Sequence, residues 1–177
     1  KIKILRSHGV LKSKNKKKPW NYNMKFLGYN YRISDIQCSL GISQLKKLNK
    51  FVKKRNEIAK IYRKNFDRVR FIKTQFVKKN NYHAYHLFPL LIDFKRIGAK
   101  KWKLFNFLSK NKIFLQVHYT PIHLQPFYKK KFGYKKGDFP VAEKFFEDEI
   151  SLPIYYNLRI KEVNRICNLI KAFLLER

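Results

Sequence analysis

The chain has 177 residues, of which 45% are hydrophobic and 16% aromatic, and this composition is sufficient to bury a domain core and excludes a disordered tail. Its net charge of +31 would suit a nucleic acid or an anionic membrane, but the lysines are spread along every segment, so we interpret them as a solvated surface and expect neither partner. No apolar run is as long as the roughly 20 residues that a membrane-spanning helix needs. The two cysteines lie far apart without a histidine at metal-ligand spacing, which favours a reduced, cytoplasmic protein with no bound metal.

The N-terminal stretch indicates the end of a helix followed by a surface loop. Apolar residues recur in the first five positions, and Gly9 is a natural left-handed residue at a helix C-terminus. The range 11–23 is rich in lysine and shows no periodicity, so it predicts either a solvated loop or a lip over an anionic substrate. Because Lys1 would lie inside a helix and is not an initiator methionine, we expect a fragment of a longer protein.

A long helix is predicted from Asp35 to Phe66. Ser34 is a preferred N-cap residue, and Gln37 three positions later completes a capping box, in which each side chain bonds to the backbone amide of the other residue. Asp35 lies in the first turn, where the helix dipole stabilises a carboxylate. One apolar stripe follows at helical spacing and is expected to be buried: Leu45, Leu48, Val52, Ala59, Tyr62 and Phe66.

Hydrophobic periodicity divides the rest of the chain into alternating strands and helices. It predicts strands at 68–76, 85–93, 113–117 and 150–155 and helices at 98–110, after an Asp138 cap, and at 160–175. Pro89 within the second strand indicates an edge strand or a bulge, because proline cannot donate to a ladder. The alternation favours an α/β domain preceded by a long linking helix.

Two loops carry residues that are suited to ligand binding. Immediately before the capping box, Asn30, Tyr31 and Arg32 combine an amide, an aromatic ring and a cation. Asparagine and arginine can both donate hydrogen bonds to an anion. The same composition also suits a polar loop that only leads into the helix.

The second loop, HYTPIHLQPFYKK, follows the predicted strand at 113–117. His118, Tyr119, His123 and Tyr128 crowd this loop, either to contact a ligand or to pack as an aromatic cluster. Its two histidines also suggest a metal, but the loop has no carboxylate or cysteine to complete a ligand set, so we expect none.

These motifs together resemble the DegT/StrS family of nucleotide-sugar aminotransferases, which use pyridoxal 5'-phosphate (PLP). The resemblance is carried by GYNYRISDIQCSLGISQLKKL, with RSHG before it and QVHYTPIHLQPFYKK, GDFPVAEKFFEDEISLP and a final helix after it. It spans nearly the whole chain but covers only the C-terminal part of such an enzyme. It implies an α/β protein, a PLP-dependent transferase of fold type I that is aspartate aminotransferase-like, of which this chain forms the end of the large domain and the small C-terminal domain.

The resemblance also implies a domain division and roles for individual residues. Residues 1–33 would form the end of the large-domain region with an active-site loop, 34–67 the linking helix and 68–177 the small domain. The lysine that binds PLP covalently would lie upstream of Lys1, so no catalytic residue is expected in this chain. Asn30 would bind the cofactor phosphate across the interface of a homodimer with shared active sites. Substrate would be bound by the other residues of the two loops: Tyr31, Arg32, His118, Tyr119 and His123.

The implied reaction transfers an amino group from glutamate to C4 of a UDP-linked 4-keto-6-deoxy-N-acetylhexosamine, on the way to pseudaminic acid. Arg32 would bind the nucleotide diphosphate, and His118 and Tyr119 would line the sugar or amino-donor pocket. The fragment alone would be inactive. Two alternatives remain open: a PLP-dependent sugar dehydratase of the same family, in which histidine replaces the PLP-binding lysine, and a basic nucleic-acid-binding module with aromatic residues between its lysines.

Overall fold

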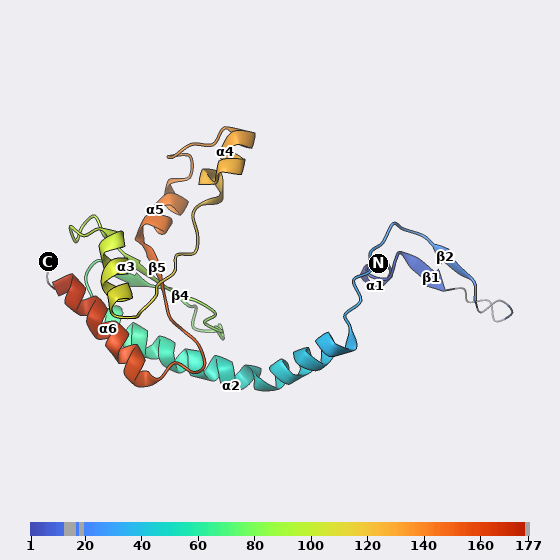
Figure 1. The fold of residues 1–177 in the computed structure, drawn as a ribbon, viewed down its shortest axis with the longest axis horizontal. Helices are drawn as coiled ribbons and strands as arrows, with labels where there is room; N and C mark the ends of the chain where they lie inside the picture. The colour runs from blue at the N-terminus through green and yellow to red at the C-terminus, as the bar shows by residue number, and fades with distance from the viewer. Residues whose placement is uncertain (13–16, 18–19, 176–177) are drawn as a thin grey trace. The chain divides into compact units, whose positions relative to one another are not determined.

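The computed structural model describes residues 1–12, 17 and 20–175 (Figure 1). The chain divides into two compact units, Lys1–Leu48 and Asn49–Arg177, whose boundary lies inside the long helix α2, Asp35–Phe66. Within the described residues, no helix combines the length and the apolar character that crossing a membrane requires. The two units are described separately below.

The first unit begins with a short helix and a hairpin. Helix α1, Ile2–Leu5, is followed by strands β1, Val10–Lys12, and β2, Tyr22–Met24, which pair antiparallel with Val10 opposite Met24. The loop expected at 11–23 is therefore wrong at its two ends, and its centre at 13–16 and 18–19 lies outside the described residues. The hairpin is held by backbone pairing rather than by burial, since β2 is exposed at every position. Its sequence therefore lacks the hydrophobic alternation that would have predicted a strand.

Two glycines let the backbone cross itself at the base of the hairpin. Gly9 has a φ of +69°, and a Cβ there would lie 1.7 Å from the carbonyl oxygen of Phe26. A Cβ on Gly28 would lie 2.2 Å from the backbone nitrogen of Gly9. The Gly9 N–H donates to the Ile4 carbonyl at 2.9 Å, but α1 ends at Leu5 with Arg6 as its C-cap, so Gly9 is left-handed as predicted without being the residue that ends the helix.

Helix α2 begins at the predicted capping box. The backbone N–H of Ser34 donates to Gln37 Oε1 at 2.9 Å, and the N–H of Gln37 donates to Ser34 Oγ at 3.4 Å. The buried residues of α2 all lie in its second half: Val52, Ile58, Ala59, Tyr62 and Phe66. Leu45 and Leu48 are 69% and 48% exposed, so the expectation that they are buried is wrong.

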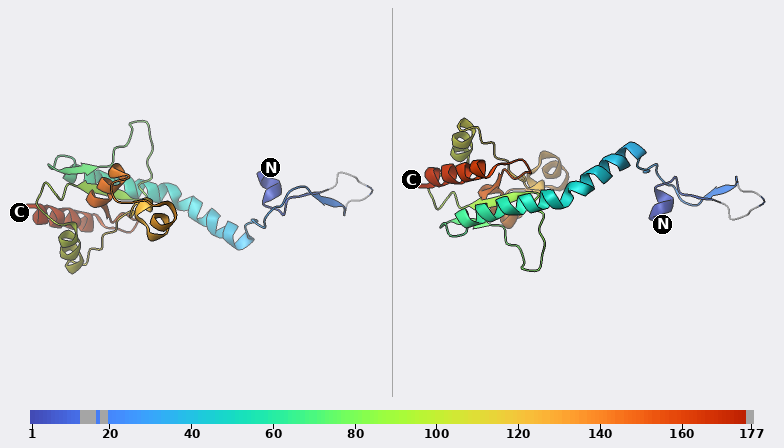
Figure 2. Two further views of the ribbon diagram at one scale, coloured as in Figure 1. Left: turned by 90° about the horizontal axis from the view of Figure 1, so that it is seen from above. Right: turned by 90° about the horizontal axis from the view of Figure 1, so that it is seen from below.

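The core of the second unit is built on a three-stranded antiparallel sheet, ordered β3 (Ile72–Thr74), β4 (Phe88–Ile92) and β5 (Glu149–Leu152). Phe88, Leu90 and Ile92 alternate along β4 toward a core formed with the second half of α2 and with helix α6, Ile160–Leu175. Helices α2 and α6 lie side by side (Figure 2), joined by a hydrogen bond from Lys171 Nζ to Asn65 Oδ1. Helix α3, Lys101–Lys110, packs against α6.

The prediction that Pro89 marks an edge strand or a bulge is wrong, because β4 is the central strand of the sheet. Pro89 lies opposite Ser151, whose backbone N–H and carbonyl both pair with Gln116 on the other side of β5. Pro89 and Ser151 therefore form a pair without mutual hydrogen bonds, and the proline nitrogen points toward the β3 side. There the ladder ends at the Thr74–Leu90 pair, so no hydrogen bond is lost.

The loop region between α3 and β5 differs from its prediction in two respects. The strand expected at 113–117 is reduced to one isolated bridge between Gln116 and Ser151. The chain then forms a 3₁₀ turn, Ile122–Leu124, and an unpredicted helix α4, Pro126–Phe132, before helix α5, Pro140–Asp148. Asp138 does not cap α5, since its Oδ2 accepts from the Lys135 N–H instead.

Removing one half of the capping box is expected to destabilise the first turn of α2. Ser34→Ala should cost about 1 kcal/mol, so that amides of this turn in the full-length protein exchange with solvent about fivefold faster. Hydrogen–deuterium exchange with mass spectrometry measures this rate. Ser39→Ala is the matched control, because Ser39 is an exposed serine inside the same helix. Equal exchange in Ser34→Ala and the wild type would contradict the predicted role of the cap.

Candidate functional site

The turn that precedes α2 is held against the end of α1 by backbone pairing. Asn30 forms an isolated antiparallel bridge with Ser7. The Tyr31 N–H donates to the Arg6 carbonyl at 2.9 Å, and the rings of Tyr29 and Tyr31 stack with centroids 4.9 Å apart. These contacts fix the backbone of the turn while its side chains stay exposed.

The side chains of Asn30 and Arg32 are in contact, so both could donate hydrogen bonds to the same anion. Arg32 Nε donates to Asn30 Oδ1 at 3.3 Å, and Arg32 Nη2 lies 3.5 Å from His8 Nε2. Asn30 therefore uses its oxygen inside the cluster, and no described residue accepts a hydrogen bond from its Nδ2. An exposed amide N–H₂ beside a guanidinium is chemically suited to phosphate. Sequence reasoning missed His8 as a member of this cluster, because its contact with Arg32 joins residues that are 24 positions apart in the chain.

In the second unit, the candidate residue His118 is attached to strand β5 by two hydrogen bonds. Its backbone N–H donates to Glu149 Oε2 at 3.0 Å, and its Nδ1 lies 2.6 Å from Ser151 Oγ. Tyr119 meets the His118 ring edge-on at 4.7 Å and is 73% exposed. Sequence reasoning missed Glu149 and Ser151, although two polar residues in the otherwise apolar stretch EISLP were an available signal.

Tyr119 also borders an apolar hollow over the start of α5. The hollow is lined mainly by nonpolar side chains: Tyr119, Pro121, Phe139, Pro140, Val141 and Phe145. Such a surface suits the apolar face of a sugar ring or of an aromatic group.

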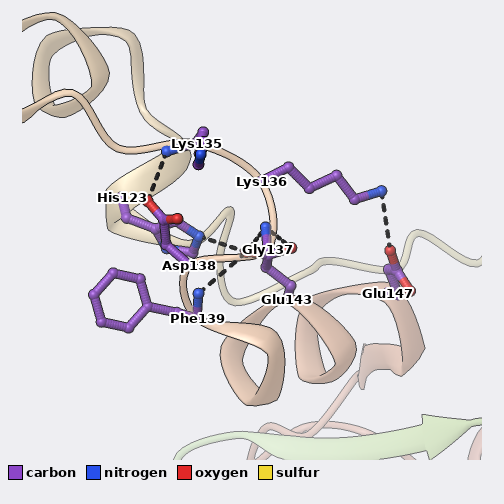
Figure 3. A network of polar contacts seen from close by, with 8 residues as sticks. All are labelled: His123, Lys135, Lys136, Gly137, Asp138, Phe139, Glu143 and Glu147. Atoms are coloured by element: carbon purple, nitrogen blue, oxygen red, sulfur yellow. Dashed lines mark hydrogen bonds and ion pairs between the residues drawn. The ribbon is translucent and has the colours of Figure 1, made fainter.

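His123, the third candidate of this loop, is buried in a polar network rather than exposed. Its Nε2 lies 2.8 Å from Glu143 Oε1, and its ring packs against Tyr134 and Phe139. Glu143 also binds the loop before α5 (Figure 3). It accepts hydrogen bonds from the Gly137 N–H at 2.8 Å and from the Phe139 N–H at 3.4 Å. Substrate contact by His123 remains a prediction.

The pKa of Glu143 is lowered by its hydrogen bond with His123 and by those from the Gly137 and Phe139 amides. Desolvation acts in the opposite direction but is outweighed. This carboxylate orders the loop that leads into α5 through the Gly137 and Phe139 amides, and no side chain caps the helix itself, whose N-cap residue is Phe139. Among the described residues, no group of three or more His, Cys, Asp or Glu side chains is placed to hold a metal ion.

The lowered pKa of Glu143 predicts a pH-dependent contribution to stability. This contribution is complete above the ordinary pKa of 4.5 and is lost as the pH falls through the lowered value of the folded protein. Glu143→Gln should therefore lower the urea midpoint of the full-length protein at about pH 7, with a difference from wild type that shrinks under acid conditions.

The matched control for this titration is Glu147→Gln. Glu147 belongs to the same helix, but its ion pair with Lys136 spans 3.6 Å between exposed side chains, so its loss should change the midpoint little at any pH. A Glu143→Gln midpoint difference that stays constant from neutral to acid pH would contradict the role given to this carboxylate.

Comparison with known proteins identifies the family of the chain. The DegT/DnrJ/EryC1/StrS aminotransferase family matches residues 1–171. The UDP-4-amino-4,6-dideoxy-N-acetyl-beta-L-altrosamine transaminase of Campylobacter jejuni is 41% identical over 162 residues, covering 92% of this chain and 41% of the relative. The chain thus spans less than half the length of that relative.

Solved structures agree with the sequence match. Helicobacter pylori PseC, an aminotransferase involved in pseudaminic acid biosynthesis, superimposes with a TM-score of 0.82 at 31% identity, covering 99% of this chain and 46% of that structure. A putative sugar aminotransferase from Streptococcus pneumoniae in its PLP form gives a TM-score of 0.81 at 28% identity, covering 98% and 42%. These matches confirm the predicted fold class, a fragment of a fold type I PLP-dependent transferase. The chain therefore belongs to the DegT/DnrJ/EryC1/StrS aminotransferase family.

Proposed function

We propose that the full-length protein is a PLP-dependent transaminase that moves an amino group from glutamate to a UDP-linked 4-keto-6-deoxy-N-acetylhexosamine. The observation that carries this proposal is the 41% identity, over 92% of the chain, to a transaminase named for such an amino sugar. The fold match to PseC supports the same substrate class and a role in making pseudaminic acid.

The residues of the first unit fit the anionic groups of cofactor and substrate. Asn30 is proposed to bind the cofactor phosphate, because its Nδ2 is left to donate once Oδ1 has accepted from Arg32. Arg32, with Tyr31 beside it, is proposed to bind the nucleotide diphosphate, for which a forked guanidinium is well suited. PLP, when bound, supplies the electron sink for amino transfer.

The loop of the second unit is proposed to bind the sugar or the amino donor. His118 offers a half-buried imidazole, and Tyr119 offers an exposed phenol at the border of the apolar hollow. A ring face and a polar edge together match a hexose, which presents apolar C–H groups on one side and hydroxyls around its rim. We also propose a homodimer in which the exposed Asn30 serves the active site of the second subunit.

Of the two enzymatic functions in this family, the transaminase has the stronger support. The relatives described above are an altrosamine transaminase, an aminotransferase involved in pseudaminic acid biosynthesis and a protein described as a putative sugar aminotransferase. A transaminase needs an amino donor and a PLP-binding lysine, whereas the dehydratase has a histidine in place of that lysine. Both differences can be tested by direct experiment.

Incubation of the purified full-length enzyme with ¹⁵N-glutamate and a UDP-4-keto-6-deoxy-N-acetylhexosamine tests the reaction. We expect ¹⁵N in the sugar product and one equivalent of 2-oxoglutarate, both detected by mass spectrometry. A product that loses a sugar hydroxyl without gaining nitrogen would indicate the dehydratase. Failure to consume glutamate with any sugar of this class would overturn the proposal.

Asn30→Ala should weaken cofactor retention without unfolding the protein. Loss of a hydrogen bond to a charged phosphate is expected to raise the PLP dissociation constant by about tenfold or more, while the melting temperature of the PLP-free protein stays unchanged because the side chain is exposed. Asn23→Ala is the matched control, since Asn23 is an exposed asparagine of the same unit on β2. Fluorescence titration with PLP gives the constants, and identical values for Asn30→Ala and wild type would refute the role of Asn30.

A further inference from the structure

Glu149 is a fully buried carboxylate to which the proposed function assigns no task. It lies in β5 with 0% exposure, next to the equally buried Ile150. A charge in such a place is stable only when donors satisfy it. Two donors do so: the His118 N–H reaches Oε2 at 3.0 Å, and the Ser151 hydroxyl reaches Oε1 at 2.5 Å.

The direction of these hydrogen bonds determines where the His118 imidazole carries its proton. The Ser151 hydroxyl donates its single proton to Glu149 Oε1. Ser151 Oγ then has only lone pairs for His118 Nδ1, which lies 2.6 Å away, so Nδ1 must be the nitrogen that bears hydrogen. The neutral imidazole is thereby left with a lone pair on Nε2.

Lys101 adds a positive charge to the surroundings of Glu149. Lys101 Nζ donates to the Phe146 carbonyl at 2.7 Å, and burial lowers the pKa of this lysine while the negative charges of Glu149 and Asp148 counteract that shift. The His118 ring itself meets Tyr119 edge-on, and no described residue hydrogen-bonds to its Nε2. That atom is free to act on a ligand.

We propose that Glu149 and Ser151 are positioning residues that hold His118 in its Nδ1–H form and so make Nε2 a hydrogen-bond acceptor for substrate. This proposal deepens the proposed function and rests on it for the identity of the substrate. An acceptor at Nε2 selects a hydroxyl or ammonium group at this point of the substrate and disfavours a carbonyl oxygen.

The substitution Glu149→Gln gives a sharp test, because it should reverse the chain of donors. The His118 N–H can only donate, so the glutamine oxygen must take its place at that amide and the N–H₂ group must face Ser151 Oγ. Ser151 then donates to His118 Nδ1, and the imidazole proton moves to Nε2. The substitution hardly changes side-chain volume, so the strand can keep its packing.

The tautomer is measured on the full-length protein labelled with ¹⁵N-histidine, from long-range ¹H–¹⁵N spectra under conditions where imidazole is neutral. His118→Gln identifies the signals by their loss. We expect the Nδ1–H pattern in wild type, the Nε2–H pattern in Glu149→Gln, and a mixture in Ser151→Ala that Ser151→Thr restores to Nδ1–H. An Nε2–H pattern in wild type, or an unchanged pattern in Glu149→Gln, would overturn the proposal.

Tyr62→Phe is the matched control for the loss of a buried hydrogen bond. The Tyr62 hydroxyl donates to the Pro153 carbonyl at 2.7 Å in the same core but makes no contact with His118, so the tautomer should not change. With the nucleotide sugar, Glu149→Gln should raise KM about tenfold while Tyr62→Phe leaves it unaltered. A reversed tautomer with an unchanged KM would overturn the role as an acceptor for substrate.

The tautomer readout does not depend on turnover. The Nδ1–H pattern in an enzyme that transfers no amino group would contradict the proposed transaminase while the positioning of His118 stands.

Discussion

The hydrogen bonds of Ser151 are the constraint on which the second unit's candidate site depends. Its backbone N–H donates to the Gln116 carbonyl at 2.8 Å, and its hydroxyl lies 2.6 Å from His118 Nδ1. One residue of β5 thus fixes both the backbone and the first side chain of the loop that begins at His118. Because every residue of β5 is buried, the loop is attached to the packed core of the unit, as a binding site of defined geometry requires.

A comparable constraint orders the turn of the first unit, where backbones rather than side chains are in contact. Gly9 and Gly28 admit an approach that any Cβ would block, and the pairing of Ser7 with Asn30 follows directly from that crossing. The polar side chains of the turn are consequently free for ligands. In both units the backbone of the loop is hydrogen-bonded within the protein, while one side-chain nitrogen stays available to a ligand. These atoms are the donor Asn30 Nδ2 and the acceptor His118 Nε2.

Features with a complete local signal were predictable from the sequence. Ser34 and Gln37 define the start of α2 because a capping box needs only residues three positions apart, and α6 was found at its true bounds because its apolar spacing is regular. Features that depend on distant partners were not predictable. Pro89 is accommodated in a central strand only because β3 ends beside it, and Asp138 bonds the Lys135 amide instead of capping α5. The candidate ligand-binding residues were predicted from the resemblance to a family. The groups that orient His118, Glu149 and Ser151, were not predicted, because they lie more than 30 positions away in the sequence.

The residue that carries the cofactor in the full-length protein tests the central claim most directly. Sequencing the coding DNA upstream of Lys1 over about one further domain, on the order of 200 residues, identifies it. The transaminase account predicts a lysine in the cofactor-binding turn of that region. A histidine at that place, or a start codon immediately before Lys1, would contradict it.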